Sequence, residues 1–220
     1  RVSGQLSSSW LYSAPAPDLD ADITASFSPM ETSFEGYDAY TFDDPAREFQ
    51  GGETVLFDAQ LNDEATARIF SNLRVDEAPG MVRANLTTRV FEPSGAFSTE
   101  YTSIRFSPYE RYVGIRTPRG DAARGMLLTD TDHTVDIVLV DEEGEPVPFD
   151  RVDAAIYKVN WRWWWESDSE NLAAYVSRNN LQPIESDQVT VRNGRGQWQF
   201  QINYPDWGRY LIRVTDESGG

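Results

Sequence analysis

Cysteine and histidine, two residues that commonly perform chemistry, are nearly absent from this chain, and no spacing of residues forms a recognisable catalytic site. The chain has no cysteine and one histidine, His133, in the run Thr131-Asp132-His133-Thr134. The lack of cysteine excludes thiol nucleophiles, thiolate metal ligands and disulfides within the chain. A Ser-His-Asp triad or a histidine metal site would depend on His133 alone. We interpret His133 as a surface turn histidine at the start of a strand.

Carboxylates are abundant, with 36 Asp plus Glu, and two groups of them alternate along the sequence. The groups are Asp18, Asp20 and Asp22, and Glu166, Asp168 and Glu170. Spaced carboxylates can bind Ca²⁺, but neither group has the turn glycine and the terminal bidentate acid of a calcium loop. No spacing selects a pair for glycoside hydrolysis either. We therefore predict no catalytic residue, no metal site and no cofactor, and a protein that is not an enzyme.

A tryptophan cluster is the most distinctive local feature, and it follows an alternating strand at residues 155–166. Because strand side chains alternate between faces, one face carries Tyr157, Val159, Trp161, Trp163 and Trp165. The opposite face carries Ile156, Lys158, Asn160, Arg162 and Trp164. One face is nearly all aromatic and the other mostly polar. This pattern predicts an antiparallel sheet that is packed on one side.

The tryptophans have a structural and a functional interpretation. In the structural one, Tyr157, Val159 and Trp161 fill a core between two sheets, and we favour it. In the functional one, Trp163, Trp164 and Trp165 form a surface for a sugar or a partner protein, since aromatic rings dominate binding hot spots. The alternative function is thus a carbohydrate-binding or adhesive pair of sandwiches that uses the cluster at residues 161–165.

The overall charge makes several partners unfavourable. The formal net charge is -17, which repels phosphate backbones and anionic membrane surfaces. No run reaches the ~20 apolar residues of a membrane helix. A hydrophobic fraction of 40% with 13% aromatics is typical of a folded globular chain. We therefore expect no nucleic-acid partner and no membrane contact from these residues.

Strand signals dominate the elements that must position these residues. Short alternating runs predict strands at 19–27, 54–61, 67–75, 81–91, 97–106, 134–140, 151–165, 188–191, 196–203 and 209–215. Turn residues separate several of them, notably Pro93 with Gly95, and Asn193-Gly194. Only residues 170–179 suggest a short helix. Regular strands of this length predict an all-β fold of antiparallel, immunoglobulin-like sandwiches.

The length of 220 residues and the strand pattern predict two domains, 1–108 and 109–220, with a boundary near Pro108. The inward faces of the strands predict the core of each domain. In the first domain it contains Ile23, Phe27, Leu86, Val90, Ile104 and Phe106. In the second domain it contains Tyr157, Val159, Trp161, Trp198, Phe200, Tyr210, Ile212 and Val214.

A weak internal repeat relates the ends of the two halves. Residues 78–95 and 205–219 each contain a strand that runs into a turn closed by Ser-Gly. In the first half a final strand follows at 97–106, whereas the second half stops at the turn. The repeat predicts that the second domain lacks its last strand, so that the edge of 209–215 is either open or paired with a strand of a second molecule.

Four stretches together resemble the macroglobulin-like domains of bacterial alpha-2-macroglobulins. They are Val2-Ser3-Gly4-Gln5 with residues 10–16, residues 37–45, residues 112–116, and residues 156–166 with Trp207-Gly208-Arg209-Tyr210. The last is the most specific, and the resemblance covers nearly the whole chain. It implies two consecutive internal domains of a large protein of the periplasm or cell envelope.

Members of this family trap proteases after cleavage of a bait region, and many carry a Cys-x-x-Gln thioester. With no cysteine here, neither a thioester nor a lipidated cysteine can be assigned to this chain. The resemblance therefore implies a scaffold segment. Its partners would be neighbouring domains of the parent chain, and proteases through the parent protein.

Overall fold

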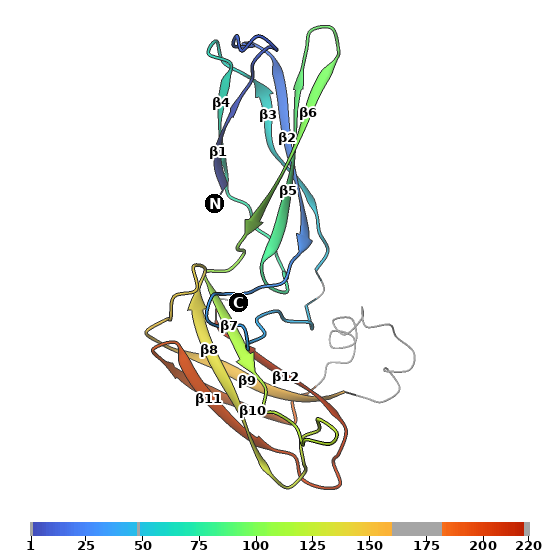
Figure 1. Ribbon diagram of the computed structural model, residues 1–220, viewed down its shortest axis with the longest axis vertical. Helices are drawn as coiled ribbons and strands as arrows, with labels where there is room; N and C mark the ends of the chain where they lie inside the picture. Colours follow the sequence, from blue (N-terminus) through green and yellow to red (C-terminus); the bar gives the residue numbers. More distant parts are fainter. Residues whose placement is uncertain (1, 48, 160–181, 218–220) are drawn as a thin grey trace. The chain divides into compact units, whose positions relative to one another are not determined.

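The computed structural model describes residues 2–47, 49–159 and 182–217, and this part of the chain is all β. It contains twelve strands in antiparallel pairs and no helix (Figure 1). In these residues there is also no helix long and apolar enough to cross a membrane. The expected all-β fold is confirmed, and the helix expected at 170–179 lies outside the described residues.

The strands belong to two compact units. The first unit comprises Arg1–Met30, Phe49–Ala78 and Val82–Pro108. Its strands are β1 (Val2–Ser7), β2 (Asp20–Pro29), β3 (Glu53–Gln60), β4 (Thr66–Ser71), β5 (Val82–Phe91) and β6 (Phe97–Phe106). They form a four-stranded sheet in the order β3-β2-β5-β6 and a two-stranded sheet of β1 and β4. The β5–β6 turn closes where Gly95, at φ 87°, donates its N–H to the carbonyl of Glu92.

The core of the first unit follows the alternation of β2. All four of its expected inward residues are buried: Ala21, Ile23, Ala25 and Phe27. Phe106 is also buried, while Leu86 and Val90 are half-buried. The prediction for Ile104 is wrong, because its side chain is 36% exposed and the rest of β6 up to Arg105 is exposed too. On the same face of β6 as Ile104 lie Ser98, Glu100 and Thr102, and β6 is an edge strand of its sheet, so this strand buries little.

The second unit comprises Glu31–Glu48, Pro79–Met81 and Tyr109–Gly220. Its strands are β7 (Arg111–Arg116), β8 (Asp132–Asp141), β9 (Phe149–Val159), β10 (Glu185–Arg192), β11 (Arg195–Gln201) and β12 (Arg209–Thr215). They follow the order β12-β9-β10-β11-β8-β7. Only Arg192 and Arg195 pair between β10 and β11, across the Asn193-Gly194 turn. The single sheet therefore behaves as two three-stranded sheets joined by one hairpin.

One face of this six-stranded sheet packs on itself to form the core of the second unit. All six strands contribute apolar side chains to a single cluster. Its buried members include Val135, Ile137, Val152, Trp198 and Phe200, and Tyr210, Ile212 and Val214 pack against it. The predicted inward positions of β11 and β12 are thereby confirmed. A core enclosed by the two halves of the sheet is the arrangement of a β-sandwich.

The predicted faces of β9 are wrong at Ile156 and Tyr157, although Lys158 is exposed as expected. Ile156, expected on the polar face, is 1% exposed, whereas Tyr157 is only half-buried. Ile156 lies opposite Ile212 of β12, and Val152 lies opposite Val189 of β10, so that these residues share the inner face. Val159 is buried at the end of the strand, as expected. The tryptophans on which the prediction mainly rested, Trp161 among them, lie outside the described residues.

Residues 31–48 lie between β2 and β3 in the sequence but belong to the second unit. Two of their rings, Phe34 and Phe42, are 6% exposed and contact each other with centroids 4.9 Å apart. Phe34 also lies 5.4 Å from the ring of Tyr112 on β7. A Cβ added to Gly114 of β7 would meet the Phe42 ring at 2.5 Å, so a glycine is needed there. This segment, which we call the insert, covers the outer face of β7 and β8. The predicted single boundary near Pro108 does not account for the insert, which packs with the second unit.

Candidate functional site

A carboxylate of the insert holds it to strand β12. Asp44 accepts hydrogen bonds from Nε of Arg213 at 2.7 Å and from Nε of Arg47 at 3.3 Å. The three side chains are only 15%, 32% and 10% exposed. Arg47 also bonds to the Tyr109 hydroxyl and lies 5.0 Å from the centroid of its ring. One anion thus joins two guanidinium groups from different parts of the second unit.

A second carboxylate fixes the start of the insert. Both oxygens of Asp43 lie 3.2 Å from the backbone nitrogen of Thr32, which donates to them. The Thr32 hydroxyl in turn accepts the N–H of Met81 at 2.7 Å. Burial raises the pKa of the Asp43 carboxyl above its usual value, and the hydrogen bonds from Thr32 oppose this rise. Because Asp43 and Asp44 are occupied in these contacts, we interpret both as structural.

A cavity of about 300 Å³ lies between the insert, β7 and β12. Its lining includes six consecutive residues of β12, Tyr210 to Thr215, together with Val113 and Ile115 of β7. Strand β12 pairs with β9 and occupies one end of the strand order. Within the described residues no strand pairs with the other edge of β12. The cavity therefore lies along a strand edge, and the carboxylates in its lining, Asp43 and Asp44, are the two that already hold the insert in place.

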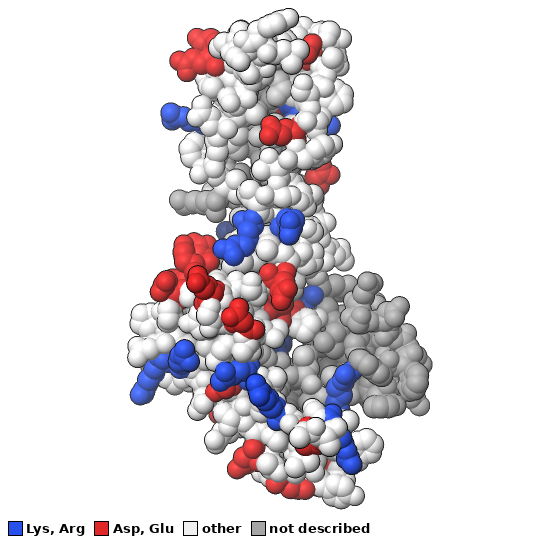
Figure 2. All heavy atoms as spheres, in the orientation of Figure 1, with Lys and Arg blue, Asp and Glu red and all other residues white. Residues whose placement is uncertain are grey.

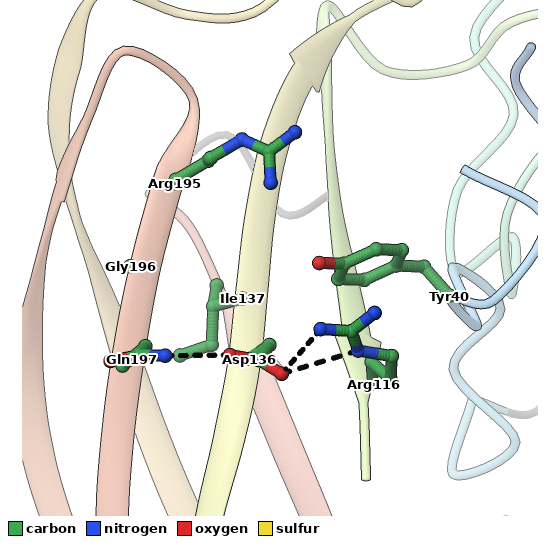
Figure 3. A pocket seen from close by; sticks show the side chains of 7 residues that line it. All are labelled: Tyr40, Arg116, Asp136, Ile137, Arg195, Gly196 and Gln197. Carbon is green, nitrogen blue, oxygen red and sulfur yellow. Dashed lines mark hydrogen bonds and ion pairs between the residues drawn. The ribbon is translucent and has the colours of Figure 1, made fainter. Parts of the chain in front are cut away.

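A larger hollow, of about 490 Å³, lies on the outer face of β7, β8 and β11 (Figure 3). Arg116, Asp136 and Gln197 are cross-strand neighbours, so their side chains form one row on this face. Arg195 lies one row away, opposite Val138. Gly196 and Ile137 complete the floor between the rows. Tyr40 of the insert forms a wall, with the Arg116 guanidinium 5.2 Å from the centroid of its ring. We call this feature the arginine hollow.

The arginine hollow contains more positively charged than negatively charged groups. Asp136 accepts from Gln197 Nε2 at 2.8 Å and from Arg116 Nη2 at 2.8 Å. These two hydrogen bonds, in that order, lower the pKa of Asp136, and the charge of Arg195 contributes to the same shift. The hydrogen bond to Asp136 raises the pKa of Arg116. Arg195 forms no ion pair within the described residues. The hollow thus combines two cations with one anion.

The residues singled out from the sequence are not part of this hollow. His133 lies at the start of β8, half-buried, with Nε2 2.8 Å from the carbonyl oxygen of Leu128 and its ring 5.7 Å from Phe200. Asp22 forms an ion pair with Arg89, at 2.9 Å. The described residues contain no cluster of three or more acidic, histidine or cysteine side chains able to hold a metal ion. Trp163, Trp164 and Trp165 lie outside the described residues, so the surface proposed for them stays a prediction.

Sequence reasoning missed the arginine hollow because its parts come from four separate segments. Tyr40, Arg116, Asp136 and Arg195 are far apart in the chain, and no short motif joins them. One signal was present: nearly all of the 19 basic residues are arginines, the cation best suited to binding a carboxylate. Two of these arginines, Arg192 and Arg195, flank the strong turn Asn193-Gly194. The tight turn brings these two residues together on paired strands, but nothing in it indicates the insert.

Two family models, one after the other, match nearly the whole chain. Residues 1–104 match the bacterial alpha-2-macroglobulin MG5 domain, and residues 114–220 match bacterial macroglobulin domain 6. Their order along the chain is that of their numbers. No curated protein is similar enough in sequence to count as a relative.

Solved structures share the fold at low sequence identity. Trypsin-activated alpha-2-macroglobulin from Escherichia coli aligns with a TM-score of 0.59 and 15% identity, over 99% of this chain and 15% of its own. A mutant Salmonella alpha-2-macroglobulin aligns with a TM-score of 0.52 and 17% identity, over 99% of this chain and 15% of its own. The Escherichia coli protein activated by porcine elastase aligns with a TM-score of 0.50 and 16% identity, over 99% of this chain and 19% of its own. The chain thus spans less than a fifth of each of these proteins. It belongs to the bacterial alpha-2-macroglobulin family and contains its macroglobulin domains 5 and 6.

Proposed function

We propose that this chain is a scaffold segment of a protease-trapping protein of the bacterial periplasm or cell envelope. The observation that carries the proposal is the pair of consecutive domain matches, which together span 1–104 and 114–220. Two structures with this fold are of proteins described as activated by trypsin and by elastase. The parent protein would therefore meet proteases, and these two domains would connect its moving parts.

The scaffold role fits the chemistry of the described residues. The polar clusters of the second unit are ion pairs and backbone contacts, and the carboxylates in them are already bound. Inhibition would come from the parent protein, with neighbouring domains as the direct partners of this segment. We propose that these residues alone neither hydrolyse a substrate nor trap a protease.

The test compares the parent protein with the 220-residue chain in one protease assay. Trypsin is incubated with each, and its activity is then measured on a protein substrate and on a small peptide substrate. A trapped protease keeps its active site but is shielded, so the parent should suppress cleavage of the protein and spare that of the peptide. The 220-residue chain should change neither rate. Stoichiometric inhibition by the chain alone, or a parent without effect on protein cleavage, would refute the proposal.

We also propose that the domains correspond to 1–108 and 109–220 along the sequence, with residues 31–48 packed as an insert in the second unit, and that one more strand completes the second domain. The support is the edge position of β12 and the cavity that borders its residues. An open strand edge tends to recruit another strand. A version of the chain longer by about ten to fifteen residues, the length of a turn plus a strand, should unfold at a higher temperature. Unchanged stability, with the β12 amides still open to hydrogen exchange, would contradict the proposal.

A further inference from the structure

The arginine hollow carries a surplus of positive charge that the fold does not use. Of its three charged residues, Asp136 and Arg116 neutralise each other through two hydrogen bonds, at 3.2 and 2.8 Å. Arg195 is exposed and has no acidic partner within the described residues. The local excess of one cation stands in a chain whose net charge is -17. Figure 2 shows basic side chains gathered over β8, β10 and β11.

The unused hydrogen-bonding groups of the hollow are mostly donors. Both oxygens of Asp136 are occupied, by Gln197 and by Arg116. The Arg195 guanidinium and the Tyr40 hydroxyl have no hydrogen-bond partner among the described residues. Figure 3 shows the Tyr40 hydroxyl turned toward the side of Arg195, across the open hollow. Arg116 uses Nε and Nη2 for Asp136, which leaves Nη1. Converging donors with a net positive charge favour an oxyanion, and the planar arginine fork suits a carboxylate.

The side chains of the hollow are also held in fixed positions by the surrounding structure. The arginines and Asp136 project from paired strands, whose register fixes their spacing. Tyr40 is held by its ring contact with Arg116 and by a hydrogen bond from its N–H to the Tyr37 carbonyl at 2.9 Å. A preorganised site loses less conformational entropy when a ligand binds. Its volume of about 490 Å³ exceeds the needs of a carboxylate alone and leaves room for the attached chain.

We propose that the arginine hollow binds the carboxylate of an aspartate or glutamate side chain presented by an extended protein segment. Arg195 is the principal contact and forms the charge-assisted hydrogen bonds. The Tyr40 hydroxyl and Nη1 of Arg116 complete the set of donors. The proposal does not depend on the trapping function, because it concerns only the second unit.

The experiment is an NMR titration of the ¹⁵N-labelled 220-residue chain. The probes are the capped tripeptides Gly-Glu-Gly and Gly-Gln-Gly, sodium acetate and inorganic phosphate, at one ionic strength. The glutamate peptide should shift the Arg195 and Arg116 side-chain resonances and saturate, and the glutamine peptide should not. Acetate and phosphate should bind more weakly than the glutamate peptide, because they lack the chain that fills the hollow.

Three variants locate the binding. Arg195→Gln should weaken the glutamate peptide at least about tenfold, the equivalent of ~1.4 kcal/mol. Tyr40→Phe keeps the ring over Arg116 and removes only the hydroxyl, so a loss of about threefold is expected. Arg151→Gln is the matched control: Arg151 is an exposed arginine of β9 outside the hollow, and its loss should leave binding unchanged. Equal weakening by Arg195→Gln and Arg151→Gln, equal binding of the two peptides, or acetate binding as tight as that of the glutamate peptide would overturn the proposal.

Discussion

Replacement of Asp44 by asparagine should destabilise the second unit more than any other single change of one surface charge. The asparagine side chain keeps an oxygen that can accept the N–H of Ala46, now at 2.9 Å, so the local turn survives. It loses the negative charge between Arg213 and Arg47. The two guanidinium groups would then remain close together without the Asp44 charge between them. The insert would lose its attachment to β12, although its rings would still pack on β7.

The magnitude follows from the exposure of the three side chains. Removing one partner of a fully buried ion pair costs about 3–5 kcal/mol, whereas an exposed pair contributes about 0–1 kcal/mol. Here Asp44 is 15% exposed and Arg213 32% exposed, which is an intermediate case. Each hydrogen bond to a charged group contributes about 1.5–3 kcal/mol when it is well shielded. We therefore expect Asp44→Asn to cost about 2 kcal/mol.

Urea unfolding, followed at the amide resonances of β8, measures this cost in the second unit alone. With an m-value of about 2 kcal/mol/M, the midpoint should fall by about 1 M. A double-mutant cycle with Arg213→Met should give a coupling energy of about 1–2 kcal/mol, and this should persist at high salt because the pair is shielded. A midpoint shift below about 0.2 M, or the same cost for Asp44→Asn in the Arg213→Met background, would refute the reasoning.

Three further changes test the packing and the charges. Gly114→Ala places a Cβ 2.5 Å from the Phe42 ring and 2.8 Å from Val138, so the thermal midpoint should fall by the equivalent of about 1–3 kcal/mol; an unchanged midpoint would mean that the insert is not seated there. Trp198→Ala should cost about 3–5 kcal/mol, but Trp198→Phe much less, because the buried indole N–H has no partner; equal costs in chemical denaturation would contradict this. Asp136 should titrate below 3.8 by NMR, so its stabilising contribution is present at neutral pH and is lost as the pH falls through that lowered pKa; Arg116→Gln should raise the pKa of Asp136, and an unchanged value would show that the ion pair is absent in solution.

Much of the secondary structure was predictable because its signals are local. The predicted strands 97–106 and 209–215 coincide with β6 and β12. The hairpin at Asn193-Gly194 has both residues at positive φ, 50° and 69°, as such a turn requires. The inward face of β2 followed from strict alternation of apolar and polar residues. The family resemblance, stated from four stretches, is confirmed by the two domain matches.

The faces of β6 and β9 were harder to predict, because burial depends on what lies opposite. Ile104 lies on β6, an edge strand of its sheet, and its side chain remains 36% exposed. On β9 the aromatic residues drew the prediction toward Tyr157, whereas the pairing with β10 and β12 buries Ile156. Alternation separates two faces but does not say which one is inside.

The sequence by itself determined the all-β class, most strand positions, the tight turns and the family, since each depends on neighbouring residues or on their order. Only the tertiary structure decided that residues 31–48 leave the unit that surrounds them in sequence and cover β7 and β8 of the other. It also decided that Tyr40 and Arg195, which lie 155 positions apart in the sequence, face one hollow. The physical reason is that these contacts form between segments distant in the sequence. The packing of Phe42 on a glycine, or of a carboxylate between two arginines, produces no periodic pattern by which the sequence could reveal it.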